Sequence, residues 1–225
     1  MFQRYSVLFL TLILLLPGVA SAQGAGNAQI QNLAEQLLMG ADVKVEGASL
    51  ATTHLIPEFY SRREFTPAWT DDDKIDEMIR IVGNITQDGL DPSDYLFAEL
   101  SALVKEYRES PDDADLQGQL DVLLTESLGR LGNHLLFGKV DPADLDENWN
   151  WVQSTDGLDP ATTVQQAIDS ASIEEFVGDF LDRGPFYRRL QAMLAEYREI
   201  SRTGGWPQIS EGPTLKPGMQ DPRIN

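Results

Sequence analysis

The sequence predicts a mostly α-helical protein, in which an irregular helical scaffold domain follows an N-terminal signal helix and precedes an extended C-terminal tail. Apolar residues recur at helical spacing through most of the chain, as is typical of amphipathic helices. No segment shows the strict alternation of a strand, and no repeat with a period of about 20 to 50 residues occurs. The chain of 225 residues is long enough for one ordinary domain with tails.

Residues 1–22 have the pattern of a secretory signal peptide. Arg4 gives a positive start, an apolar run covers residues 7–16, and Ala20 and Ala22 are the small residues that a signal peptidase reads. The run is too short for a retained helix that spans a bilayer, which needs roughly 20 apolar residues. We therefore expect a cleaved signal, a periplasmic location and no retained transmembrane helix. An uncleaved N-terminal anchor is the alternative.

Residues 23–49 are interpreted as a leader and linker. A short amphipathic helix is predicted from four apolar residues at helical spacing: Ile30, Leu33, Leu37 and Leu38. Residues 40–49 contain glycine and alternate polar with small residues. This composition indicates a linker, so we expect the folded domain to begin near residue 50.

The helical scaffold domain is predicted over residues 50–203. Apolar residues at helical spacing indicate a first helix near residues 55–60 and a second near residues 75–85. Thr70 or Asp71 is placed to cap the second helix, and the acidic residues that follow suit the positive end of its dipole.

The longest predicted helix lies in the middle of this domain. Before it, Gly89 is placed to end one helix, and Asp91 followed by Pro92 predicts the start of another. The long helix itself ends at Gly138 and has a near-continuous apolar face: Leu116, Leu120, Leu123, Leu124, Leu128, Leu131 and Leu135. The face is wide and lacks sustained heptads, so it favours a central core helix over a coiled coil or a groove for a partner helix.

The last part of the domain contains a loop over residues 139–159 and two predicted helices, near 160–170 and 173–181. A final helix follows Gly184, and we expect its apolar face to close the domain: Phe186, Leu190, Met193, Leu194 and Tyr197. Residues 204–225 then contain glycine and proline and are interpreted as a linker towards another module.

Charge and composition exclude several classes of function. The chain carries 36 acidic residues against 17 basic ones, for a net charge of −19, so we do not expect it to bind nucleic acid. It contains no cysteine, which rules out disulfides, a thiolate nucleophile and cysteine zinc sites. With only two histidines, neither a metal nor a cofactor is expected.

Several stretches, taken together and in order, resemble the N-terminal scaffold region of periplasmic murein L,D-transpeptidases. They cover most of the chain after the signal: Leu55 to Tyr60 with Pro67 to Trp69, Asp88 to Tyr95, Leu123 to Pro142, and Tyr187 to Tyr197 running into Gly204 to Pro207. In addition, Leu215 to Gly218 with Asp221 and Arg223 resembles the entry to the peptidoglycan-binding module of that family.

The resemblance implies a cell-wall enzyme that joins peptidoglycan stems by 3→3 cross-links, with a cysteine nucleophile and a histidine base. The Ser-x-Gly-Cys-x-Arg pattern of that family cannot occur in a chain without cysteine, so no active-site residue can be carried over. We therefore expect a non-catalytic scaffold with the start of the peptidoglycan-binding module and no catalytic domain. Its partners would be the adjoining modules or the peptidoglycan-synthesis machinery.

The candidate contact residues are four tryptophans: Trp206, Trp149, Trp151 and Trp69. They could stack on sugar rings or contact a module, although loop tryptophans more often fill gaps between helices. Trp206 lies between the last helix and the tail, so it is the residue we most expect to contact a module.

The sequence leaves two other functions open. The first is a free-standing exported adaptor that binds an envelope protein through its acidic surface. The second is a wall hydrolase that uses two carboxylates, but acidic residues are too abundant for any pair to stand out. His54 and His134 have no visible nucleophile to activate. The acidic loops at 88–94 and 141–146 lack the order of ligands found in an EF-hand.

Overall fold

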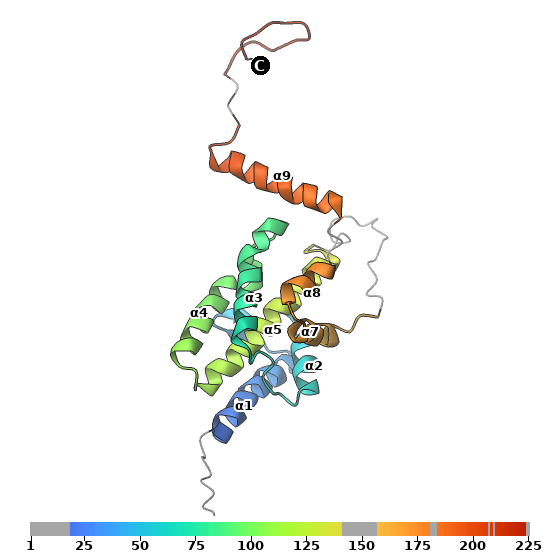
Figure 1. Ribbon diagram of the computed structural model, residues 1–225. Coiled ribbons are helices and arrows are strands. Elements are labelled where there is room, and N and C mark those ends of the chain that lie inside the picture. The colour runs from blue at the N-terminus through green and yellow to red at the C-terminus, as the bar shows by residue number, and fades with distance from the viewer. Residues whose placement is uncertain (1–18, 141–156, 181–183, 207, 209, 224–225) are drawn as a thin grey trace, which may run out of the picture.

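The computed structural model describes residues 19–140, 157–180, 184–206, 208 and 210–223 (Figure 1). These residues are mostly helical, which confirms the predicted fold class. The elements in chain order are α1 (Val19–Leu38), β1 (Lys44–Val45), β2 (Ala48–Ser49), α2 (Leu55–Arg62), α3 (Asp72–Asn84), η1 (Ile85–Asp88), η2 (Pro92–Tyr95), α4 (Phe97–Glu109), α5 (Ala114–Phe137), α7 (Pro160–Asp169), α8 (Ile173–Phe180) and α9 (Pro185–Arg202), where η marks a 3₁₀ helix.

Helix α5 is the centre of the body, as predicted. It contacts α1, α2, α3, α4, α7 and α8, and the middle of its leucine face is buried: Leu120, Leu123, Leu124, Leu128 and Leu131. Asp113 caps its first turn by accepting hydrogen bonds from the backbone N–H groups of Asp115 and Leu116. Gly138, with φ +85°, ends the helix.

The residues that cap α3 and end the turn after it are those predicted from the sequence. Asp71 caps α3 by accepting from the N–H of Asp73, and Gly89, with φ +80°, ends the 3₁₀ turn that follows the helix. Asp91 caps as predicted, but it starts only the short 3₁₀ helix η2. Leu96, in a left-handed conformation, separates η2 from α4.

The interpretation of residues 23–49 as a leader and linker is wrong for its larger part. Ile30, Leu33 and Leu37 of α1 are buried in the same core as α5, whereas Leu38 is exposed. Helix α1 approaches α5 closely at Gly118, where an added Cβ would lie 3.0 Å from the backbone oxygen of Gly26. The folded body therefore begins within α1, well before residue 50.

Residues 43–50 form a hairpin instead of a linker. Lys44 pairs with Ser49 and Val45 with Ala48, so the two strands are joined by a two-residue turn. Both turn residues, Glu46 and Gly47, have positive φ, as a type I′ turn requires. Val43, Val45, Ala48 and Leu50 are buried in the core. The sequence signal was weak because glutamate seldom takes the first position of such a turn.

The expectation that the last helix closes the domain is also wrong. Helix α9 contains no buried residue, and it stands at one end of the body in Figure 1. The described residues after α9 form no helix or strand. Within the described part of the chain, no helix combines the length and apolarity needed to cross a bilayer.

Candidate functional site

A buried polar network joins α2, α5 and the loop before α3. The carboxylate of Asp121 accepts hydrogen bonds from the Tyr60 hydroxyl (2.6 Å), from the N–H of Ala68 (2.9 Å) and from the N–H of Trp69 (2.8 Å). The Trp69 indole N–H donates to the Thr125 hydroxyl at 3.0 Å. Burial raises the pKa of Asp121 above its usual value, and these donors partly offset that effect. Every group is engaged within the fold, so the network is structural.

A second buried carboxylate fixes the hairpin to α5. Glu126 accepts from the backbone N–H groups of Ala51 (2.7 Å) and Thr52 (3.1 Å), and from Nε of Arg130 at 2.6 Å. Arg130 also donates to the carbonyl oxygen of Ser49 at 2.6 Å. Sequence reasoning missed both acidic residues. The available signal was their position on a helix that is otherwise apolar and buried.

The described residues place neither histidine beside a nucleophile. His54 is exposed just before α2. Nδ1 of His134 lies 3.0 Å from the Tyr95 hydroxyl, burial lowers the pKa of His134, and burial raises the pKa of Tyr95 to about 12. The described residues contain no group of three or more acidic or histidine side chains that could hold a metal ion.

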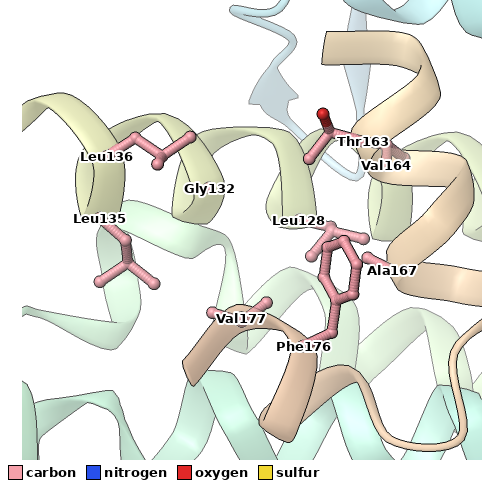
Figure 2. Close-up of a pocket in the computed structure, with 9 residues that line it drawn as sticks. All are labelled: Leu128, Gly132, Leu135, Leu136, Thr163, Val164, Ala167, Phe176 and Val177. Carbon is pink, nitrogen blue, oxygen red and sulfur yellow. The ribbon is translucent and has the colours of Figure 1, made fainter. Parts of the chain in front are cut away.

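An apolar pocket lies where α5, α7 and α8 meet. Figure 2 shows the Phe176 ring of α8 between α5 and α7, with Leu128 and Leu135 of α5 and Val164 of α7 among its lining residues. The pocket has a volume of about 40 Å³ and no charged lining residue. Ligand sites usually measure about 300 to 1,000 Å³ and contain a few polar groups, so this pocket is a packing gap.

The most unusual surface is the outer face of α9, which we call the α9 seam: Phe186, Leu190, Met193 and Tyr197. All four side chains are exposed, and Phe186 is 75% exposed. A run of exposed apolar side chains along one helix is typical of an interaction surface. No other helix in the described residues leaves so long an apolar stripe uncovered.

The flank of α9 next to this stripe attaches the helix to the body; its residues each follow a seam residue by one position. Asp88 of η1 accepts hydrogen bonds from the Tyr187 hydroxyl (2.6 Å) and from Nε2 of Gln191 (2.7 Å). Arg198 donates to the carbonyl oxygen of Thr86. A groove of about 540 Å³ lies beside this junction and is lined by two alanines and five polar residues: Gln87, Gln191, Arg198, Glu199 and Arg202. Leu194 adds an apolar contact near Gly89, whereas the four residues of the α9 seam remain exposed.

The candidate tryptophans differ in how exposed they are. Trp69 is only 3% exposed, so it fills the core, and the expectation that it contacts a module is wrong. Trp206 is 66% exposed, and its ring lies edge-on to Tyr197 with 6.3 Å between centroids. Trp206 therefore extends the α9 seam. Trp149 and Trp151 lie outside the described residues.

The comparisons with known proteins agree with the helical body. The profile of the Scaffold domain matches residues 54–194, which is more than half of the chain. No curated protein and no solved structure gives a significant match. The matched range runs from α2 into α9 and is consistent with the scaffold region of L,D-transpeptidases that the sequence resembles. The chain belongs to the Scaffold domain family.

Proposed function

We propose that this chain is the non-catalytic scaffold portion of an exported L,D-transpeptidase and serves in peptidoglycan cross-linking. The observation that carries the proposal is the Scaffold domain match over residues 54–194, together with the order of the family-like segments. A chain without cysteine cannot form the thioester on which that chemistry depends. Its contribution would be to hold adjoining modules or a partner in place.

The architecture suits such a role. The body builds its core around α5 and satisfies its two buried carboxylates internally, so it can serve as a fixed support. Helix α9 is attached at one end of that support and leads directly into the tail that starts at Gly204. In this proposal the body positions α9 and the tail for whatever module or partner lies next to them.

Two experiments test the proposed function. Purified residues 23–225, incubated with peptidoglycan and its acyl-donor stems, should form no 3→3 cross-linked muropeptides. Addition of a separately purified cysteine-containing transferase module should restore the product. Cross-linking by the chain alone would contradict the non-catalytic assignment, and a transferase module that neither binds the chain nor responds to it would contradict the scaffold role.

Export is a separate part of the proposal and has its own test. In a Gram-negative host, the chain should be recovered from the periplasmic fraction in a form shorter by the predicted signal. The Ala22→Arg variant should accumulate as the longer precursor, because a signal peptidase does not accept a large charged residue at this position. Processing that is indifferent to this change would argue against the predicted cleavage site.

The exposed α9 seam also favours a second candidate, a free-standing exported adaptor. The DNA downstream of Asn225 separates the two. A reading frame, continuous or frameshifted, that encodes Ser-x-Gly-Cys-x-Arg supports the scaffold of a transpeptidase. A clean stop followed by an unrelated gene supports the adaptor.

A further inference from the structure

We propose that the α9 seam is a self-association surface, on which α9 of one copy pairs antiparallel with α9 of a second copy. The proposal rests on the spacing of the exposed apolar residues and on the charges beside them. It does not depend on the proposed enzymatic context.

The spacing of the seam is that of a coiled coil. Phe186, Leu190, Met193 and Tyr197 follow one another at intervals of four, three and four residues, and Ile200 continues the series. Such alternation keeps apolar side chains on one narrow line and suits packing against another helix at a small crossing angle. Because the residues are exposed, the body does not supply that other helix.

In an antiparallel pair of α9 helices, the seam residues of the two copies pack against one another in layers. If Leu190 of one copy packs against Met193 of the other, Phe186 then packs against Tyr197 of the other copy. The two-fold axis repeats both layers, so every member of the seam is covered. Trp206, which already contacts Tyr197 at its edge, would lie beside the end layers.

The charges flanking the seam fit the same register. Arg189 and Glu196 lie on the flank of the seam that faces away from the body, both are exposed, and neither forms an ion pair with another described residue. In the register set by Leu190 and Met193, Arg189 of each copy lies opposite Glu196 of the other, so the pair carries two complementary contacts. Charges beside the seam commonly set partner and orientation in helix pairs.

The local charge of α9 also permits self-pairing in a strongly acidic protein. Four of the 17 basic residues of the chain lie within this one helix, against two acidic ones: Arg188, Arg189, Arg198 and Arg202 with Glu196 and Glu199. In Figure 1, α9 stands at one end of the body and contacts it through η1, so a second helix can lie along the seam. A single helix pair buries little area, below the roughly 1,200 Å² of a stable interface, so the dimer should be weak.

The first test is sedimentation velocity of residues 23–225 over a concentration series. We expect monomer at ~10 µM and mostly dimer near ~1 mM, in keeping with a small interface. Arg189→Glu and Glu196→Arg each place like charges opposite one another twice and should raise the dissociation constant by about tenfold. The double variant restores opposite charges and should return the dissociation constant to that of the wild type.

A matched control changes charge elsewhere. Lys105→Glu alters the net charge as much as Arg189→Glu does, on an exposed position of α4, and should leave the dissociation constant unchanged. Circular dichroism of all variants checks that the fold is intact. A chain that stays monomeric throughout the series, or a double variant that fails to recover, overturns the proposal. Binding of α9 to another protein or to anionic vesicles by a chain that remains monomeric overturns it as well.

The second test determines whether the two α9 helices pair parallel or antiparallel. Because the native chain has no cysteine, any disulfide must form through the introduced cysteines. In an antiparallel pair, mixing the Leu190→Cys and Met193→Cys variants should give a disulfide heterodimer on mild oxidation, because these positions share a layer. Each variant alone should cross-link less. Efficient cross-linking of Leu190→Cys with itself and not with Met193→Cys would indicate a parallel pair and contradict the proposed register.

Discussion

The body and α9 use their apolar residues in opposite ways. In α5 the leucine face is buried against several other helices, and the polar residues among those leucines are bonded within the fold. In α9 an equally regular apolar face is exposed, and the helix is held to the body by hydrogen bonds from its neighbouring flank and by Leu194. An amphipathic pattern therefore identifies a helix face that packs against other apolar residues. It does not show whether those residues belong to the same chain or to another one.

The largest effect is expected from removing the carboxylate at the centre of the body. Asp121→Ala would leave the Tyr60 hydroxyl and the N–H groups of Ala68 and Trp69 without their acceptor. We expect the free energy of unfolding to fall by about 3–5 kcal/mol, since several buried donors are orphaned at once. Urea unfolding measures this, with the exposed Asp112→Ala as control. A loss below about 1 kcal/mol would show that the network does not support the body.

The next effect tests whether α1 belongs to the body. Gly118→Ala places a Cβ 2.9 Å from Cβ of Gln29 and 3.0 Å from the oxygen of Gly26, so α1 has to shift. We expect a loss of about 1–3 kcal/mol from overpacking. Gly132→Ala, in the same helix with open space around it, should instead gain up to about 1 kcal/mol from helix propensity. Equal responses of the two variants would mean that α1 is not packed there.

The sequence predicts the body well where local signals and burial agree. The leucine spacing located α5, and Asp71 and Gly138 marked helix ends through capping chemistry that depends only on neighbouring residues. The hairpin at 43–50 was missed because its turn begins with a glutamate of positive φ. Whether α1 joined the core could not be read locally, because it depends on a close approach between glycines that are far apart in sequence.

The candidate site was less predictable than the fold. The apolar face of α9 was identified from its spacing, yet the same spacing wrongly predicted burial. Trp206 was placed correctly at the end of that helix, and its contact with Tyr197 is a feature only the structure gives. Asp121 and Glu126 could not be singled out, because acidic residues are abundant in this chain and helical spacing alone does not show which of them are buried.

A smaller effect is expected from pH. Burial lowers the pKa of His134 below its usual value of 6.5, so the folded state binds this proton less readily than the unfolded state. The contribution to stability is therefore full above about pH 6.5 and is lost as pH falls towards the lowered folded pKa. The unfolding free energy of His134→Gln should decrease less between pH 7 and pH 5 than that of the wild type.

The smallest effect is expected on the seam itself. Leu190→Ser removes an exposed apolar side chain that the body does not cover, so the unfolding free energy of dilute protein should change by less than about 0.5 kcal/mol. Leu123→Ser, within the buried face of α5, provides the contrast and should destabilise strongly. A similar loss from both would remove the distinction between the two regions.

Native-state hydrogen exchange of residues 23–225 at low concentration tests most directly whether the body is self-sufficient and α9 is an attached, uncovered helix. Amides in the middle of α5 should exchange only through global unfolding, whereas those of α9 should exchange through local opening and be at least ~100-fold less protected. Equal protection of α9 and α5, lost together with denaturant, would contradict this division of the molecule.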